Sequence, residues 1–389
     1  MKEKETKSVR IQTERTQYRE HSTPLFLTSS FVFNSAEHAR DIFSEEVEGH
    51  SYSRFGNPNT DEFIDKLKYL EKMEDGFAFA TGMAAVFSGM AALLKSGDHI
   101  LGCRSVFGST HSLFINIFPK WGISHTYVDA DKPEEWEKHI QPNTKMIFAE
   151  TPSNPGLELI DLEFLGNLKK KHNLLLNIDN CFATPVIQNP ADYGADLVTH
   201  SATKFIDGQG RVLGGAVLGS KELIKQIRIF ARTTGPALSP FNAWILSKSL
   251  ETLSLRMEKH CNNAFTIAEE LEKNNEINFV RYPFLKSHPQ YELAKKQMKL
   301  GGGLIAFEVK GGSERAMSFI NNIKMLSVTS NLGDSRTTIT HPASTTHSKL
   351  TEEERLAVKI TQGMVRVSVG LENHEAILED ITQALDNSK

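Results

Sequence analysis

The stretch Asp196–Gly219, which reads DLVTHSATKFIDGQGRVLGGAVLG, decides how the rest of the chain is interpreted. Its apolar start, Leu197–Val198, is typical of a buried strand. Lys204 follows directly, beside the hydroxyl residues Ser201 and Thr203, and a glycine-rich loop comes next. A lysine at the end of a buried strand is unusual, because lysine is almost never fully buried unless it is paired.

Burial gives such a lysine a specific chemistry. A buried ammonium tends to lose its proton, and a neutral lysine amine is a nucleophile that forms a Schiff base with an aldehyde cofactor. The two hydroxyl groups beside Lys204 can hydrogen-bond a phosphate. A surface lysine behind an edge strand is the ordinary alternative, so the interpretation depends on whether the rest of the chain completes a pyridoxal phosphate site.

Size and composition exclude several classes of protein. At about 150 residues per domain, a chain of 389 residues predicts two or three domains. The formal net charge of −4 argues against a nucleic-acid or membrane-surface partner. The charged start MKEKETKSVR predicts no secretory signal, and no apolar run approaches the roughly 18 residues of a membrane-spanning helix. Three widely spaced cysteines predict neither disulfides nor a metal site, so we expect a cytoplasmic protein.

Residues 1–56 are polar with short apolar patches, which predicts an extended N-terminal arm with a short helix near Ala36–Phe43. A segment that cannot form its own core is expected to pack on a neighbouring subunit. The sequence YSRFGNP at 52–58 predicts a loop from its glycine, asparagine and proline content. Within it, Arg54 is either a surface arginine or a phosphate clamp, and taken alone the surface arginine is favoured.

Residues 57–245 alternate short apolar strands with helices, which predicts an α/β domain with a mostly parallel sheet. A helix is predicted to begin at Asn59 and to end at Gly76, before the strand Gly76–Ala80. After a Thr81-Gly82 turn, Met83–Leu94 predict a buried helix. A helix N-terminus is a potential anion site, because free N–H groups and the helix dipole point at one place. An ordinary strand-to-helix turn is the alternative.

Three more strands of this domain are predicted at Asp98–Leu101, Lys145–Ala149 and Leu174–Ile178, and the last of them ends at Asp179. Ligands of α/β proteins bind beyond the carboxyl ends of the strands. A carboxylate there can accept the proton of a pyridinium nitrogen and keep the ring electron-withdrawing. A capping role explains Asp179 alone equally well. Phe107 is likewise either core or an aromatic face for a planar ring.

The pattern changes near residue 245, and residues 246–389 predict a smaller C-terminal α+β domain. Trp244–Glu272 predict one long helix, and the strands that follow alternate with polar helices. Arg366 lies in the last predicted strand, Val365–Val369. An arginine that points inward needs an anion, and a substrate carboxylate can accept two parallel hydrogen bonds from it. A structural salt bridge is the alternative.

Together these motifs resemble the pyridoxal-phosphate-dependent enzymes of cysteine and methionine metabolism. The motifs, which follow one another over nearly the whole chain, are YSRFGNP (52–58), TGM (81–83), ETPSNP (150–155), IDNCFATP (178–185), HSATKFIDGQGR (200–211), HPAS (341–344) and VRVSVGLE (365–372). The resemblance implies an α/β fold of the aspartate aminotransferase class, fold type I, in a homotetramer of two active dimers.

The resemblance also implies roles for individual residues. Lys204 would bind pyridoxal 5'-phosphate and shuttle protons, Asp179 would pair with the pyridine nitrogen, and Phe107 would stack on the ring. The residues implied to hold the cofactor phosphate are Gly82, Met83, Ser201 and Thr203, completed by Tyr52 and Arg54 of the neighbouring subunit. The residues implied to face the substrate are Asn154, Ser330 and Arg366.

Within the family, HSATKFIDGQGRVLGG, RTTGPALSPFNAW and NLGDSRTTITHPAS are most similar to the O-succinylhomoserine sulfhydrylases. The implied reaction, in methionine biosynthesis, is γ-replacement on an O-acylhomoserine by sulfide to give homocysteine, with O-succinylhomoserine as the expected donor. Three alternatives stay open. They are a cystathionine γ-synthase that takes cysteine, a γ-lyase that releases ammonia and a keto acid, and an inactive member that serves as a binding subunit.

Three positions depart from the family pattern. Phe107 stands where most members have a tyrosine, which keeps the stacking face but removes a phenol that could donate a proton. This difference favours a sulfhydrylase over a lyase. Cys181 replaces a common threonine, and Asn331 replaces a serine before Leu-Gly.

Overall fold

The computed structural model describes residues 2–348 and 350–389, and its larger sheet has seven strands in the order β1-β7-β6-β5-β4-β2-β3. Only β7 runs against its neighbours, β1 and β6, so the expected mostly parallel sheet is confirmed. The strands are β1 (Asp75–Phe79), β2 (His99–Cys103), β3 (Ser124–Val128), β4 (Thr144–Glu150), β5 (Leu175–Asp179), β6 (Leu197–Ser201) and β7 (Gly215–Gly219).

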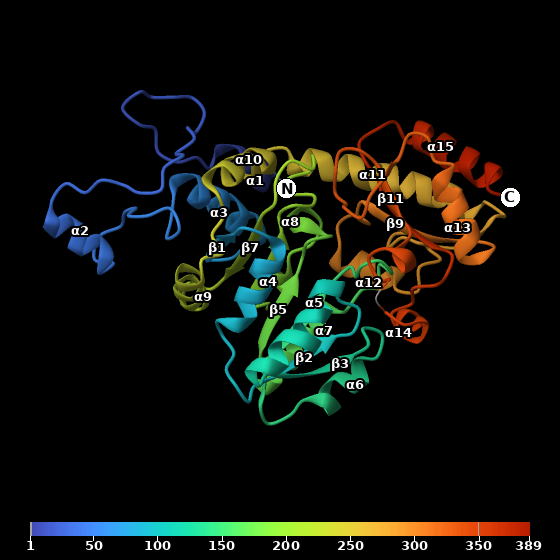
Figure 1. Ribbon diagram of the computed structural model, residues 1–389, viewed down its shortest axis with the longest axis horizontal. Helices are drawn as coiled ribbons and strands as arrows, with labels where there is room; N and C mark the ends of the chain where they lie inside the picture. Colours follow the sequence, from blue (N-terminus) through green and yellow to red (C-terminus); the bar gives the residue numbers. More distant parts are fainter. Residues whose placement is uncertain (1, 349) are drawn as a thin grey trace.

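Helices pack around this sheet (Figure 1). Strands β4, β5 and β6 carry buried apolar residues because helices cover both faces of the sheet, and Ile147, Leu176 and Val198 are fully buried. The helices of this part are α3 (Pro58–Glu71), α4 (Gly82–Ala91), α5 (Gly108–Ser112), α6 (Pro133–Trp136), α7 (Leu162–His172), α8 (Thr184–Ile187), α9 (Lys221–Thr234) and α10 (Pro240–Leu250).

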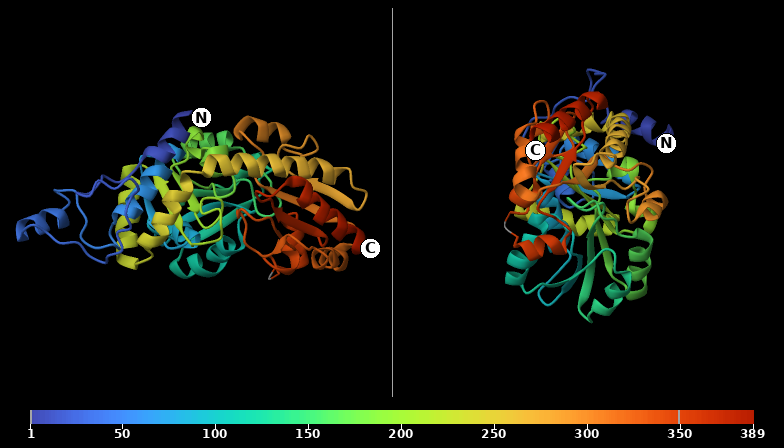
Figure 2. Two further views of the ribbon diagram at one scale, coloured as in Figure 1. Left: turned by 90° about the horizontal axis from the view of Figure 1, so that it is seen from above. Right: turned by 90° about the vertical axis from the view of Figure 1, so that its right-hand side faces the viewer.

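A second, smaller sheet has five strands in the order β10-β11-β12-β9-β8. Its strands are β8 (Ile277–Arg281), β9 (Leu304–Val309), β10 (Ser327–Val328), β11 (Thr338–Thr340) and β12 (Met364–Ser368). Its helices are α11 (Leu253–Glu272), α12 (Tyr291–Gln297), α13 (Gly312–Asn321), α14 (Glu352–Ala357) and α15 (His374–Asn387). Helix α11 runs from the larger part of the molecule along this sheet, as the view from above in Figure 2 shows.

The N-terminal segment extends away from the body of the molecule, with α2 (Ala36–Phe43) at its outer end (Figure 1). Helix α2 has the predicted bounds. The segment leaves Val32 97% and Tyr18 83% exposed, so its apolar side chains find no core within this chain. A first helix, α1 (Lys2–Arg10), was not predicted, and it docks on the body because Lys4 donates to the Leu70 carbonyl at the end of α3.

The predicted bounds of the helix before β1 were wrong at both ends. Helix α3 starts at Pro58, and the cap is Asn57, which forms a capping box with Thr60. Proline fits the first helical position because its missing N–H has no partner there in any case. The helix ends at Glu71, since Lys72 takes a left-handed conformation with φ of 61°.

The single long helix predicted over 244–272 is also wrong, because the chain breaks between α10 and α11. The side chain of Arg256 binds the Ser249 carbonyl through Nη2 at 2.9 Å, and that carbonyl lies in the last turn of α10. The last carbonyls of a helix have no N–H partner within that helix, and here the arginine side chain supplies the missing donor. Among the residues that the structure describes, no helix is both long and apolar enough to cross a membrane.

Candidate active site

Lys204 lies in the turn after β6 and reaches the loop between β10 and β11. Its Nζ donates a hydrogen bond to Oδ1 of Asn331 at 3.0 Å. Burial lowers the pKa of Lys204, and the charge on Arg366 lowers it further, while Cys181 and Asp179 oppose this change. A lysine with a lowered pKa supplies a neutral amine, which can act as a nucleophile or as a base.

Asp179 is the last residue of β5 and is 8% exposed. Its Oδ1 accepts the N–H of Cys181 at 3.0 Å, and among the described residues this is the one hydrogen bond to the carboxylate. Burial raises the pKa of Asp179 to about 6, against the opposing effects of the Cys181 N–H and of His200 and Lys204. No donor among the described residues reaches the second oxygen, so the site is suited to a cationic group such as a protonated ring nitrogen.

Glu150 ends the neighbouring strand β4 and pairs in register with Asp179. Its Oε2 accepts the N–H of Phe107 at 2.9 Å, and Phe107 lies directly before α5. The structure therefore brings the predicted ring-stacking residue to the predicted carboxylate through a residue that was not predicted. The sequence signal for Glu150 was its position at the end of a buried strand, but only the strand register shows that it lies next to Asp179.

The predicted phosphate residues meet where β6 approaches the N-terminus of α4. The chain is so close there that a Cβ on Gly82 would lie 2.6 Å from Oγ of Ser201. Gly82 and Met83 occupy the first turn of α4, where N–H groups have no acceptor within the helix. Thr203 is nearby in sequence, but its hydroxyl is engaged with the backbone N–H and carbonyl of Gly214.

Arg366 on β12 is 2% exposed, and the groups that bind it are neutral. Its Nη1 donates to Oδ1 of Asn154 at 2.9 Å, and its Nη2 donates to the Ser330 carbonyl at 2.8 Å. Its Nε is buried without a partner, and within residues 2–348 and 350–389 no acidic side chain pairs with it. Burial lowers the pKa of Arg366 to about 10.

A buried guanidinium without a carboxylate calls for an anion from outside the chain. The alternative of a structural salt bridge for Arg366 is therefore wrong for this chain. The structure brings Asn154, Ser330 and Arg366 together, as expected, although Ser330 contributes its carbonyl and its side chain is exposed. Asn331 was noticed only as a departure from the family pattern, and its contact with Lys204 is a result of the tertiary structure.

Tyr52 and Arg54 lie apart from this group within their own chain. The guanidinium of Arg54 donates to the carbonyl of Arg232 on α9 and lies 4.8 Å from the ring centre of Phe55. Tyr52 is 42% exposed. Neither residue shares a hydrogen bond with Ser201, Thr203 or Gly82 in the part of the chain that the structure describes.

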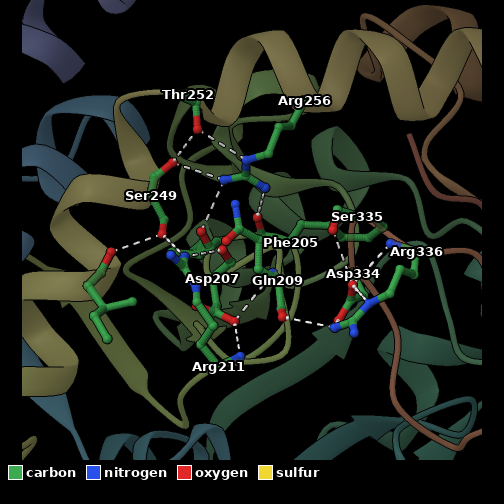
Figure 3. Close-up of polar contacts among 12 residues, drawn as sticks. Phe205, Asp207, Gln209, Arg211, Ser249, Thr252, Arg256, Asp334, Ser335 and Arg336 are labelled. Carbon is green, nitrogen blue, oxygen red and sulfur yellow. Dashed lines mark hydrogen bonds and ion pairs between the residues drawn. The ribbon is translucent and has the colours of Figure 1, made fainter. Parts of the chain in front are cut away.

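Two arginines hold the loop that follows the lysine in place (Figure 3). Arg256 donates to the carbonyls of Phe205 and Ile206 at 2.6 and 3.1 Å. Gly208 has φ of 70°, and a Cβ there would lie 2.6 Å from the guanidinium carbon of Arg256. Arg336 donates to the carbonyl of Gln209 at 3.2 Å. These contacts explain the glycine at position 208 and fix the turn that carries Lys204.

The arrangement fits pyridoxal phosphate. Three groups lie at one edge of the larger sheet. They are Asp179 at the end of β5, with a free carboxylate oxygen; Lys204 after β6, with a lowered pKa; and the N-terminus of α4 at Gly82. This is the edge at which α/β proteins bind ligands. A buried arginine that lacks an anion lies on the side of the second sheet, as an amino-acid substrate requires.

Comparisons with known proteins agree with this geometry. A family model described as "Cys/Met metabolism PLP-dependent enzyme" matches residues 5–386. The chain is 46% identical to an O-succinylhomoserine sulfhydrylase of Pseudomonas aeruginosa, over 98% of this chain and 94% of that protein. It is 43% identical to an L-methionine gamma-lyase of Porphyromonas gingivalis, over 94% and 92% of the two chains.

A solved structure extends the comparison to the fold. A protein of Campylobacter jejuni assigned as an O-acetylhomoserine (thiol)-lyase aligns with a TM-score of 0.95 at 33% identity, over 98% of this chain and 99% of that chain. That structure contains N'-pyridoxyl-lysine-5'-monophosphate at position 205 of its own chain. The expected fold type I architecture and the expected cofactor are thereby confirmed.

Proposed function

Because this chain belongs to the Cys/Met metabolism PLP-dependent enzyme family, we propose that it converts O-succinylhomoserine and sulfide to homocysteine, a step of methionine biosynthesis. The observation that carries the proposal is that Lys204 and Arg366 both donate to Asn331. The loop that contains Asn331 thus contacts both a base and a carboxylate-binding group. The similarity to the Pseudomonas aeruginosa sulfhydrylase supports the acyl donor.

The cofactor is held by groups from three elements in this proposal. Lys204 binds it covalently through its amine, and Asp179 accepts a hydrogen bond from the ring nitrogen. Gly82 and Met83 would offer their N–H groups to the phosphate, together with the hydroxyl of Ser201, whereas the hydroxyl of Thr203 is engaged with Gly214. When bound, pyridoxal phosphate supplies an electron sink that stabilises negative charge at the substrate Cα.

The substrate carboxylate is bound by Arg366 in the proposed reaction, with Asn154 holding the guanidinium in place. This orients the substrate Cα–H toward Lys204, whose lowered pKa suits it to proton removal. Lys204, freed when the substrate's own amine takes its place, would remove the protons of Cα and Cβ in turn, and the acyloxy group would depart from Cγ as a carboxylate. Sulfide then adds at Cγ, and the two carbon-bound protons are returned.

Phe107 distinguishes this reaction from its nearest rival. A γ-lyase must also remove its leaving group from Cγ, but it releases ammonia and a keto acid. Phe107 presents a ring without a hydroxyl, so it has no proton to give to a leaving group or to an amine at this position. The methionine gamma-lyase of Porphyromonas gingivalis is nearly as similar in sequence as the sulfhydrylase, so the assay has to include both reactions.

The N-terminal arm completes the site of a neighbouring subunit in this proposal. Tyr52 and Arg54 end the exposed segment, and neither binds the phosphate residues of its own chain. The exposure of Val32 and Tyr18 supports an arm that is covered by another copy. We therefore propose a homotetramer of two active dimers, with a body of residues 57–245 and a C-terminal domain of residues 246–389.

The test is a comparison of kcat/KM for O-succinylhomoserine and O-acetylhomoserine, each offered sulfide and cysteine. We expect homocysteine from O-succinylhomoserine and sulfide to form fastest. Cystathionine as the main product would reassign the chain to cystathionine γ-synthase. Keto acid and ammonia formed without a nucleophile would reassign it to the lyases.

A matched pair of variants controls the assay. Lys204→Ala is expected to abolish turnover and the absorbance of bound cofactor. Lys169→Ala removes a lysine that pairs with Asp196, just before β6 and outside the site, at 2.6 Å. It is expected to retain both.

A further inference from the structure

Two carboxyl groups lie side by side at the ligand edge of the larger sheet. Glu150 and Asp179 are the last residues of adjacent parallel strands and pair in register. Residues paired in this way project to the same face of a sheet. Both are buried, with exposed fractions of 6% and 8%. Two carboxylates that share a buried site do not readily ionise together.

The surroundings of the pair are unequal. His200 on β6 and Lys204 after it favour the ionised form of Asp179, as does the Cys181 N–H. Glu150 has one hydrogen bond, from the Phe107 N–H, and no cation of the described chain acts on it. Burial and the neighbouring Asp179 charge raise the pKa of Glu150 well above its ordinary value, whereas the pKa of Asp179 rises to about 6. Of the two carboxyl groups, Glu150 therefore has fewer neighbours that favour its charge.

We propose that Glu150 is a positioning residue that, in its neutral form, holds the Phe107 backbone on the strand next to Asp179. One of its oxygens accepts the Phe107 N–H and so fixes the ring that faces the cofactor. Its neutrality leaves the negative charge of the pair on Asp179, where the ring nitrogen needs it. A single side chain thereby sets both the stacking face and the charge beneath it.

This inference rests on the proposed places of Asp179 and Phe107 at the cofactor, and it is independent of the acyl donor. It can therefore fail while the proposed reaction holds. Its readouts are the affinity for pyridoxal phosphate and the absorbance spectrum of bound cofactor as a function of pH. Neither readout requires a substrate.

Glu150→Gln and Glu150→Leu separate the two roles. Gln stays neutral and keeps an oxygen for the Phe107 N–H, so we expect cofactor affinity and the neutral-pH spectrum to stay within about twofold of wild type. Leu is also neutral but lacks the acceptor, so we expect weaker cofactor binding, by roughly tenfold or more for one lost buried hydrogen bond, and a shifted absorbance maximum. In wild type a spectral transition should accompany the ionisation of Glu150 as pH rises, and the Gln variant should lack it.

Glu158→Gln is the matched control. Glu158 accepts a hydrogen bond from Ser105 in the same loop at 2.8 Å, but it contacts neither Phe107 nor Asp179. We expect its spectrum, and the pH-dependent transition of that spectrum, to match those of wild type. If the spectrum of Glu150→Gln is shifted as far as that of Glu150→Leu, the proposal that Glu150 is neutral in wild type is contradicted. A Leu variant that binds cofactor as wild type does would overturn the link to Phe107.

Discussion

Lys204 and Arg366 share a partner, since both donate hydrogen bonds to Asn331 although they come from different sheets. The amine bonds Oδ1 at 3.0 Å, and the guanidinium bonds the backbone carbonyl at 3.4 Å. The distance between base and carboxylate-binding group is therefore set by one residue of the loop between β10 and β11. The same short segment therefore positions both the group that reacts with the substrate and the group that binds its carboxylate.

The first prediction concerns Arg366. Arg366→Lys keeps the positive charge but loses the planar fork, and the lysine cannot also hold Asn154 and the Ser330 carbonyl. Loss of charge-assisted hydrogen bonds worth about 2–3 kcal/mol should lower kcat/KM roughly 30- to 150-fold. Steady-state kinetics should show the loss mainly in KM. The control residue, Arg315, lies on the distant helix α13 and pairs with Glu276. Arg315→Lys should change kcat/KM by less than about twofold.

The second prediction concerns the close approach at the phosphate site. Gly82→Ala places a Cβ 2.6 Å from Oγ of Ser201, so α4 must move away from β6. Overpacking of this kind costs about 1–3 kcal/mol, and we expect cofactor affinity to fall roughly 5- to 150-fold. Cofactor titration of the apo-protein measures it. In Gly156→Ala the nearest atom to the new Cβ is 3.8 Å away, and unchanged affinity is expected; equal losses in both variants would contradict the argument.

The third prediction concerns pH. Asp179 has a pKa of about 6, raised by burial from an ordinary 3.8, so its ionised form is disfavoured in the folded protein. The apo-protein therefore loses stability as pH rises from about 4 to about 6, relative to Asp179→Asn, which stays neutral. We expect the Asn variant to have the higher Tm above pH 6 and an equal Tm near pH 4.

Bound cofactor should reverse that order, because a protonated ring nitrogen pairs with the ionised carboxylate and not with the amide. Thermal melts of both proteins, with and without pyridoxal phosphate, test the whole argument. An Asn variant that is stabilised by the cofactor as strongly as wild type would remove Asp179 from the ring nitrogen.

The fourth prediction tests the shared site of two subunits. Arg54→Ala and Lys204→Ala should each be nearly inactive. If Arg54 serves the neighbouring subunit, a mixture of the two variants, dissociated and reassembled, contains sites with both native residues and regains activity. Arg54 acting within its own chain predicts no recovery. Arg40→Ala, from the outer helix α2 with a side chain 71% exposed, serves as the control that should stay active.

Several features of this protein follow from the sequence alone. Short apolar runs predicted β4, β5 and the start of β6, because strands covered on both faces of a sheet are rich in apolar residues. The bounds of α2 were predicted correctly, since local capping and periodicity decide them. The motif set also predicted the cofactor and the family, which the comparisons confirm. The roles of single site residues stay predictions until they are measured.

The tertiary structure decided what local signals could not. The single helix over 244–272 fails because Arg256 turns back to a carbonyl that sequence periodicity does not show. Strand register made neighbours of Glu150 and Asp179, which are 29 positions apart in sequence and carry no motif in common. Packing of the second sheet gave Arg366 no acidic partner among the described residues, and it placed Asn331 within hydrogen-bond distance of Lys204. The sequence determines which groups are present through local chemistry, and only long-range packing determines their distances, burial and charge.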